Sequence, residues 1–486
     1  MQDLVSGANQ DSRSAEVAKQ ALSQLPRTLE RLRDYLRIPA ISCDTAHHPD
    51  VVRLSRRLAE DLAKLGFSGA RALELEGALP LVCAERRAAV ADRPTLLIYG
   101  HFDLQPVQGE AWRSPPHEAR LEAGRLYARG AADDMGGWMS HLAAIEAWLS
   151  VVGELPVHVK LVIEGEEEIG SPNLERYMDA FPEVFTADVM VLTDCENPST
   201  EVPGLTVSLR GLLEVELGVE ALEADVHSGL WGNMVPDPAT SLILLLARLL
   251  DEHGRLALGR REVPEAWRLA AAAAPPSRDL VAHAAHLLPG VAPLPDEGRP
   301  PAEWLWRQPA LTVLSTTLPR PNEQKNAVRR RASATLSIRL APGQTAAEMM
   351  QLLEAVLLVN PPGGVRVQLE ARPGGAQSWL YEPSGPVFDA VDRAYEKGFG
   401  QRPVQVGVGG SIPFVALFGR RFSHLPLVLN GVMDPETGAH GPNESLHLGV
   451  FEKTLVSNVY LLEELGRLPA GSCSLVSDDG TCVGAP

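Results

Sequence analysis

The stretch Thr95-Leu-Leu-Ile-Tyr99 is an apolar run of strand length, and the turn that follows it carries His101 and Asp103. A continuous apolar run predicts a strand that is buried on both faces of a sheet. Comparable runs occur at 79–84, 157–163 and 189–192, with helical patterns at 138–151 and 173–177 between them. This alternation predicts an α/β fold with a mostly parallel, twisted sheet flanked by helices.

Helical spacing of apolar residues also precedes the first strand. It covers 15–38, where Pro26 predicts a break into two helices or a capped start, and 51–65, where Gly66 ends the pattern. After about residue 378 the same signals return, as a helix at 386–397 and a strand at 427–429. The sheet is therefore expected to be built from both ends of the chain.

The pattern between these two parts is different. Residues 209–219 alternate apolar and polar positions, which predicts a strand with one wet face, at or next to the edge of its sheet. A helix at 238–250, strands at 311–316 and 332–340, a helix at 346–359 and a strand at 365–370 follow. This order is close to a ferredoxin-like β-α-β-β-α-β module. Residues 255–307 show no readable pattern.

The expected organisation is a catalytic domain interrupted by a smaller α+β domain. The catalytic domain takes residues 1–208 and 375–468, and the inserted lid or dimerisation domain takes 209–374. The segment 469–486 is rich in Gly, Ser and Asp and is expected to be a loose tail.

Composition narrows the class of protein. The formal net charge of −18 argues against binding to nucleic acid and against docking on an anionic membrane. The five cysteines are dispersed and form no C-x-x-C pair, which fits free thiols in a reducing compartment. Together with the absence of an apolar signal region in residues 1–15, this predicts a cytoplasmic enzyme.

Histidine and acidic residues gather where the predicted strands end. Each feature has an ordinary alternative when taken alone: His101-x-Asp103 could cap a loop, Asp133 or Asp134 could be a helix N-cap, and the acidic run 166–168 could be solvated surface. Adjacent carboxylates repel one another unless a cation holds them together. The whole set therefore favours a cation site over the separate explanations.

A centre with two metal ions roughly 3.5–4 Å apart needs a bridging carboxylate, further ligands for each ion and an open position for water. One carboxylate on a metal with a second beside it as proton shuttle suits hydrolysis. Mixed nitrogen and oxygen ligands accept zinc, manganese or cobalt. The chain offers a matching inventory of ligands: His101, Asp133, Glu168, Asp194 and His440.

With these motifs, residues 25–465 resemble the di-zinc metallopeptidase family that includes carnosinase-type dipeptidases, aminoacylase, succinyl-diaminopimelate desuccinylase and carboxypeptidase G. The resemblance implies a zinc-aminopeptidase-like catalytic fold, two divalent ions per subunit with zinc as first choice, and a cis peptide after Asp133. It implies one ion on His101, Asp133 and Asp194, and the other on Asp133, Glu168 and His440. It also implies that Glu167 is the general base and that Asp103 orients His101.

The inserted domain carries family marks as well. Asp225-Val-His227-Ser-Gly229 resembles the motif whose histidine reaches the active site of a partner subunit, which implies a homodimer; the alternative is an ordinary turn histidine. Asn326 and Arg339 resemble substrate-contacting residues of the dipeptidase branch. Gly410 and Ser411 resemble the loop that binds the substrate's terminal carboxylate.

The sequence after Asp103 (Leu-Gln-Pro) and the long insert look more like the dipeptidases than the acylases. Met135, where that branch commonly has Lys, and the run 329–331, where a Pro-containing segment is expected, depart from the pattern. The leading function is hydrolysis of an amide bond in a dipeptide or short peptide by a two-metal-activated water. The alternatives are an N-acyl amino acid amidohydrolase and a catalytically silent scaffold. A serine or cysteine hydrolase lacks support, because no G-x-S-x-G is present and acidic neighbours should blunt Cys195.

Overall fold

The computed structural model describes residues 2–109, 111–265, 267–268, 277–318, 323–410, 412–423, 425–469, 471 and 473. It divides into two compact units. The larger consists of Met1–Val207, Tyr381–Val406 and Leu417–Pro486, and the smaller of Ser208–Leu380 and Gly407–Ala416. The segment Gly407–Ala416, which the sequence analysis placed with the second part of the catalytic domain, thus groups with the inserted part. No described helix is both long and apolar enough to cross a membrane.

A six-stranded sheet forms the centre of the larger unit, in the order β1-β2-β6-β3-β7-β17. The last four strands in this order run parallel to one another, whereas β1 and β2 pair in antiparallel fashion, so the prediction of a mostly parallel sheet is confirmed. The carboxyl ends of β3, β6 and β7 meet at one edge of the sheet. The strands are β1 (Ser68–Leu73), β2 (Leu81–Arg86), β3 (Thr95–His101), β6 (His158–Glu164), β7 (Val189–Leu192) and β17 (Leu427–Leu429).

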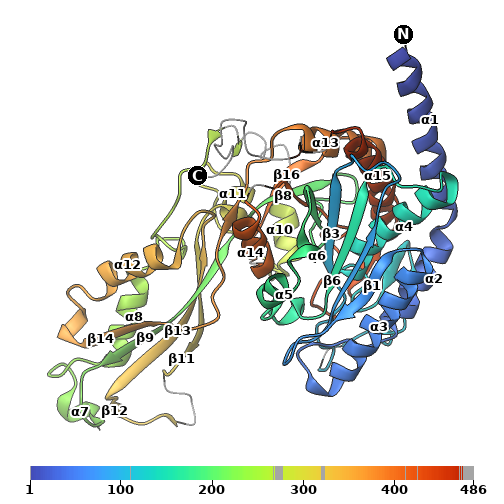
Figure 1. Cartoon of the computed structure of the whole chain (residues 1–486). Helices are drawn as coiled ribbons and strands as arrows, with labels where there is room; N and C mark the ends of the chain where they lie inside the picture. Colours follow the sequence, from blue (N-terminus) through green and yellow to red (C-terminus); the bar gives the residue numbers. More distant parts are fainter. Residues whose placement is uncertain are drawn as a thin grey trace. The chain divides into compact units, whose positions relative to one another are not determined.

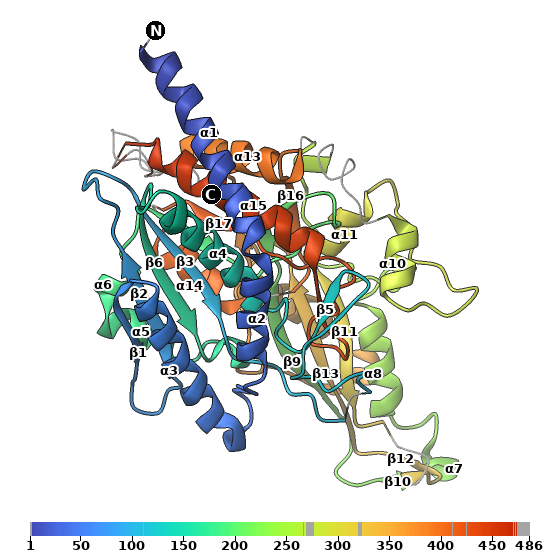
Figure 2. The same cartoon turned by 90° about the vertical axis from the view of Figure 1, so that its right-hand side faces the viewer.

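Helices cover both faces of this sheet, as Figures 1 and 2 show. On one face, side chains of alternate strand positions such as Leu96 and Ile98 join the core of α3, α4 and α15, with α1, α2 and α13 packed outside. On the other face, Tyr99 meets the ring of Phe418, which also contacts Phe185. The helices are α1 (Gln2–Ser23), α2 (Leu25–Leu36), α3 (His48–Lys64), α4 (Met135–Val151), α5 (Leu174–Ala180), α6 (Pro182–Phe185), α13 (Pro386–Phe399), α14 (Pro413–Arg421) and α15 (Leu448–Gly466).

Two of these helices bear on the sequence predictions. The break between α1 and α2 falls where Pro26 predicted it, because proline is tolerated in the first turn of a helix. Helix α15 was not predicted. Its buried residues lie nearly all round the axis, so its sequence lacks the one-sided spacing that identifies a surface helix.

The smaller unit contains a four-stranded antiparallel sheet in the order β11-β13-β9-β14. Along the chain its elements follow β-α-β-β-α-β, as the ferredoxin-like prediction required. Strand β9 is bonded on both sides and lies next to the edge strand β14, so the predicted place next to an edge is confirmed. The elements are β9 (Gly211–Glu220), α8 (Pro238–Ala247), β11 (Ala310–Thr316), β13 (Arg331–Leu340), α12 (Ala346–Leu357) and β14 (Arg366–Ala371).

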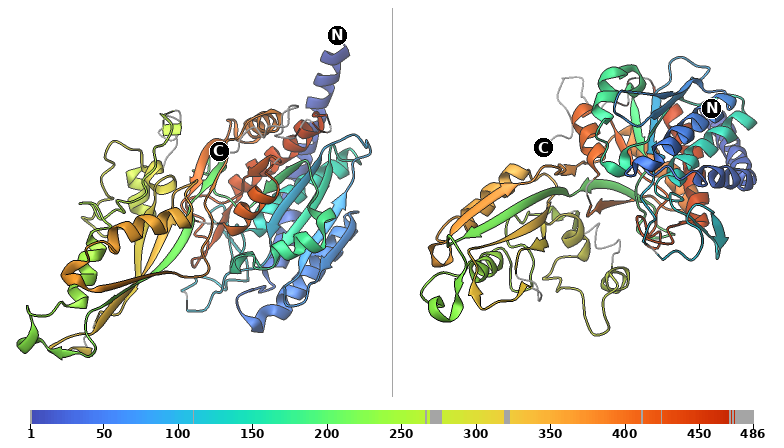
Figure 3. Two further views of the ribbon diagram at one scale, coloured as in Figure 1. Left: turned by 60° about the vertical axis from the view of Figure 1, so that its left-hand side comes forward. Right: turned by 90° about the horizontal axis from the view of Figure 1, so that it is seen from below.

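The alternation along β9 sorts its residues onto two faces. Leu213, Val215, Leu217 and Val219 form one apolar cluster with α8 and α12, so both helices cover the same face (Figure 3). The opposite face of β9 and β13 carries polar side chains such as Glu216 and Thr335, which are hydrogen-bonded to one another at 2.9 Å. The part of 255–307 that is described contains the short helices α10 (Arg278–Ala284) and α11 (Pro301–Trp306).

Short strands complete the fold. They form a ribbon β10-β12 and the three-stranded sheets β15-β8-β16 and β18-β5-β4. The elements are β4 (Arg120–Glu122), β5 (Arg125–Tyr127), β8 (Gly204–Leu209), β10 (Val226–His227), α7 (Ser228–Trp231), β12 (Ala327–Val328), β15 (Trp379–Leu380), β16 (Val404–Val408) and β18 (Ser445–His447).

Candidate metal centre

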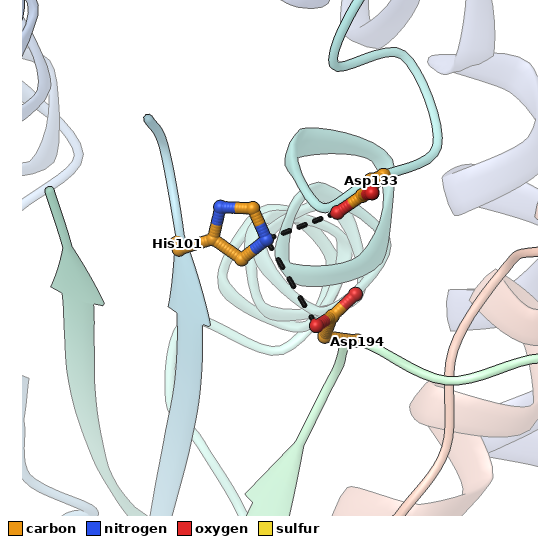
Figure 4. A group of neighbouring side chains, drawn as sticks. All are labelled: His101, Asp133 and Asp194. Carbon is orange, nitrogen blue, oxygen red and sulfur yellow. Dashed lines mark hydrogen bonds and ion pairs between the residues drawn. The ribbon is translucent and has the colours of Figure 1, made fainter. Parts of the chain in front are cut away.

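His101 is the last residue of β3 and is fully buried at the carboxyl edge of the large sheet. Its Nε2 lies 3.1 Å from Asp133 Oδ1 and 3.9 Å from Asp194 Oδ2 (Figure 4). Its Nδ1 lies 3.1 Å from the backbone oxygen of Asp103, which can only accept a hydrogen bond. Nδ1 therefore donates to that oxygen, and Nε2 is the ring nitrogen that faces the two carboxylates.

Asp133 lies between two histidines. It occupies the turn before α4, and its peptide bond to Asp134 is cis, as expected. Its Oδ1 faces His101, and its Oδ2 lies 3.1 Å from Nε2 of His440. Each oxygen of one carboxylate thus faces a different imidazole, which is the arrangement that a bridging ligand of two cations requires.

Glu168 completes the second group of ligands. It lies in the 3-10 turn Glu167–Ile169 that follows β6, and its Oε2 is 3.2 Å from His440 Nε2. Among the described residues, two groups have ligand atoms within 4.8 Å of one another. They are His101, Asp133 and Asp194, and Asp133, Glu168 and His440. These are the same two sets that the family resemblance implied.

Glu167 belongs to neither group. Its side chain is 12% exposed, and its Oε2 lies 4.0 Å from His101 Nε2, close to the ligands but outside the bridging pair. The carboxylate of Asp103 accepts hydrogen bonds from the backbone N–H groups of Glu167 (3.1 Å) and Glu168 (3.0 Å). Asp103 thus fixes the turn that presents both glutamates, and its backbone oxygen, not its carboxylate, is nearest to His101.

The electrostatics of the cluster are those of a site built for cations. Burial, together with the charge of Asp133, raises the pKa of Asp194 to about 7. Burial also raises the pKa of Glu167 well above its usual value. Hydrogen bonds to Asp133 and Glu168 raise the pKa of His440 to about 11. Protons therefore balance the clustered carboxylates, and divalent cations on this mixed nitrogen and oxygen donor set can replace them.

The other predicted site residues lie in the smaller unit. His227 is exposed, and its Nδ1 accepts a hydrogen bond from Gly229 N at 3.0 Å, which leaves the ring proton on Nε2. Asn326 is also exposed, and its backbone oxygen accepts a hydrogen bond from Ser228 N. Gly410 follows β16, and Ser411 lies outside the described residues.

Arg339 and His227 are far apart within this unit. Arg339 on β13 is paired with Leu212, near the start of β9, whereas Arg331 is paired with Glu220 at its end. His227 lies beyond that end, in the ribbon β10-β12. Eight residues of extended strand span about 26 Å. A dipeptide is far shorter than this, so His227 and Arg339 of one chain cannot contact the same dipeptide.

Sequence reasoning did not assign three residues that adjoin the centre, of which Glu166 and Glu444 are buried and Gln105 is half-buried. Gln105 donates to Glu168 Oε2 at 2.7 Å, and Glu166 accepts from Leu79 N at 2.8 Å and from Asn173. Glu444 accepts four hydrogen bonds from the turn that carries Asp133. Each of the three lies inside a motif that the sequence analysis singled out. In each motif, however, only neighbouring residues match the ligand positions that the family resemblance implies.

Cysteine chemistry is not supported at this site. Cys195 is buried, and burial followed by the charge of Asp194 raises its thiol pKa, as its acidic setting suggested. The cysteines described, 43, 83, 195 and 473, are all free thiols, as predicted, and Cys482 lies outside the described residues.

Comparisons with known proteins agree with this geometry. Residues 97–464 match the sequence profile of peptidase family M20/M25/M40. A cysteinylglycine-S-conjugate dipeptidase of Corynebacterium striatum is 33% identical over 381 residues, which cover 78% of this chain and 82% of the relative. The human Beta-Ala-His dipeptidase is 25% identical, covering 89% and 84%. The structure of the M20 family metallo-carboxypeptidase Sso-CP2 from Sulfolobus solfataricus superposes with a TM-score of 0.74 at 29% identity, over 91% of this chain and 99% of that one.

Proposed function

Since the chain belongs to peptidase family M20/M25/M40 and is a metallopeptidase, we propose that it hydrolyses dipeptides at a centre of two divalent cations. The observation that carries the proposal is Asp133, whose two carboxylate oxygens each lie 3.1 Å from a different histidine. A third ligand completes each set, Asp194 on one side and Glu168 on the other. We take zinc as the first choice, with manganese or cobalt as alternatives.

When bound, two divalent ions lower the pKa of water and polarise the scissile carbonyl. The residues of the chain provide the rest of the chemistry. Glu167 stands beside the ligands with its carboxylate uncommitted to either group, so it is placed to accept a proton from water and to deliver it to the leaving amine. Asp103 holds this turn in place through the backbone N–H groups of Glu167 and Glu168.

We propose a substrate with a free terminal carboxylate. By their names, two of the relatives given above act on a cysteinylglycine S-conjugate and on Beta-Ala-His, both dipeptides. On this chain the guanidinium of Arg339 and the loop of Gly410 and Ser411 would bind the carboxylate. The test is a hydrolysis screen of cysteinylglycine, its S-conjugates, Beta-Ala-His and a panel of N-acyl amino acids, each with zinc, manganese and cobalt. We expect dipeptides to be cleaved faster than any N-acyl amino acid.

A different ranking in the screen would give a different function. Preferential hydrolysis of N-acyl amino acids would make the protein a deacylase that uses the same centre. A protein that binds no metal and cleaves nothing in the screen would be the silent scaffold.

We further propose that the working form is a homodimer formed through the smaller unit. His227 and Arg339 of one chain lie at opposite ends of the sheet. A substrate held by Arg339 would therefore have to receive His227 from a second copy of the chain. The tautomer of His227 supports this role, since its Nε2–H is available to donate to a developing oxyanion. Closed two-fold dimers are the commonest oligomers.

Complementation between two inactive chains tests the dimer. His227→Ala and Glu167→Gln should each be nearly inactive as homodimers. In a mixed dimer, one of the two sites has its own Glu167 and receives His227 from the partner. Random exchange places about half of the dimers in the mixed form, so about a quarter of wild-type activity should return. If activity stays absent while subunit exchange is demonstrated, His227 does not act in trans.

A further inference from the structure

Glu444 carries an unusually complete set of hydrogen bonds for a buried carboxylate. Its side chain is fully buried, and its Oε2 accepts from Arg129 Nη1 at 3.0 Å and from Gly130 N at 3.1 Å. Its Oε1 accepts from the backbone N–H groups of Ala132 at 3.1 Å and Asp133 at 3.2 Å. One side chain therefore holds the whole turn that presents the bridging Asp133.

The position of Glu444 in the chain gives these bonds a second consequence. It stands four residues after His440, and its own backbone oxygen accepts from Ala128 N at 3.1 Å. The next residue, Ser445, begins β18, which pairs with β5 just before the turn. Glu444 thus joins the segment that supplies His440 to the segment that supplies Asp133, and these two side chains meet in the second ligand group.

Arg129 extends the same network. Its guanidinium lies over the ring of Trp112 at 5.2 Å from the centroid and donates to the backbone oxygen of Pro106 at 3.4 Å. The preceding residue, Gln105, donates to Glu168 Oε2. The segments that carry Gln105, Asp133 and His440 are therefore connected through one buried pair of charges, Glu444 and Arg129.

We infer that Glu444 is a positioning residue, which sets the geometry of Asp133 and His440 so that divalent cations bind tightly between them. This inference rests on the proposed metal function. An amide cannot replace the carboxylate, because all four partners are donors. In either orientation the NH₂ of a glutamine would face two N–H groups, leaving both without an acceptor.

The experiment compares Glu444→Gln with a matched control, Asp434→Asn. Asp434 is equally buried and binds Arg125 through both oxygens, at 3.2 and 2.7 Å, in the neighbouring part of the same unit. Among the described residues it is hydrogen-bonded to Arg125, Glu436 and Thr437, none of which is a predicted ligand or part of the turn 129–133. Both substitutions remove one charge from a buried carboxylate–arginine pair, so both should lower the thermal stability of the protein stripped of metal.

Metal affinity separates the two variants. After removal of metal with a chelator, each protein is titrated with Zn²⁺ against a chromophoric chelator, and the absorption bands of the Co²⁺-loaded forms are recorded. We expect Glu444→Gln to bind at least one equivalent about 10–100-fold more weakly, with shifted Co²⁺ bands. Asp434→Asn should keep wild-type affinity and bands. Glu444→Asp keeps the charge on a shorter side chain, so its metal affinity should lie between those of the wild type and Glu444→Gln. This variant tests the inference if Glu444→Gln does not fold.

Two results would overturn the inference: wild-type affinity and bands in the Glu444 variants, or an equal loss of affinity in Asp434→Asn, which would show general loosening of the unit. Failure of the proposed metal centre looks different, because the wild-type protein itself would then bind no zinc.

Discussion

Replacing Glu167 by glutamine is the most direct perturbation of the proposed chemistry. The change keeps the volume of the side chain and removes its charge. Asp103 holds Glu167 through the backbone, so the turn and the ligands should stay in place. Because the carboxylate lies 4.0 Å from His101 Nε2 and in neither ligand group, the loss should fall on proton transfer and not on metal binding. General base catalysis contributes about 10²–10⁴-fold, or about 3–5 kcal/mol of barrier.

The assay measures kcat on the preferred dipeptide together with bound metal, using Glu166→Gln as a control. Glu166 is a buried neighbour, and it accepts hydrogen bonds from Leu79 N and Asn173 away from the ligands. The control should lose about 1–3 kcal/mol of stability and keep near-normal turnover. Near-normal kcat in a metal-loaded Glu167→Gln protein would remove Glu167 from the role of base. An equal loss in both variants would instead mean that the turn had been disturbed.

Three further outcomes follow from the same geometry. The raised pKa values of His440 (about 11) and Asp194 (about 7) keep protons on the metal-free site at neutral pH. Cation binding should therefore release protons, and the affinity for the cation should fall as the pH falls. Calorimetry in two buffers of different ionisation enthalpy measures this release. Removing the metal should lower the melting temperature, because an ion at 100 times its Kd adds about 2.7 kcal/mol, or about 4 °C for a unit of about 300 residues. A thermal scan with and without chelator measures this shift. Arg339→Met should lower kcat/KM about 10–150-fold for a dipeptide but leave the corresponding dipeptide amide unchanged, because the lost charge-assisted hydrogen bond is worth about 1.5–3 kcal/mol; equal losses on both substrates would contradict carboxylate binding.

The fold could be predicted where local pattern and burial agree. The apolar runs gave β3, β6 and β7 within one or two residues, and strict alternation gave β9. Short elements such as β4, β5 and β18 escaped because three residues carry no period. Helix α15 escaped for the opposite reason, since a helix buried nearly all round has no polar face to mark its period.

The site could be predicted as far as ligand chemistry identifies residues. His101, Asp133, Glu168, Asp194 and His440 were selected by residue type and by their place at the ends of predicted elements, and the structure brings them together in two groups. The residues that hold them could not be selected in this way. The role of Glu444 depends on which N–H groups surround its side chain, and those donors precede it by more than 300 residues of sequence.

These supporting contacts limit how far the clustered carboxylates can move apart. Like charges at such short range would separate if their backbones were free to move. Asp103 holds the turn of Glu167 and Glu168, and Glu444 holds the turn of Asp133. Asp134 accepts a hydrogen bond from Thr193, beside Asp194. Every carboxylate ligand is thus fixed through hydrogen bonds to the backbone or to a residue next to it. An entering cation therefore meets ligands that are already ordered, so the free energy of its binding is not consumed in assembling the site.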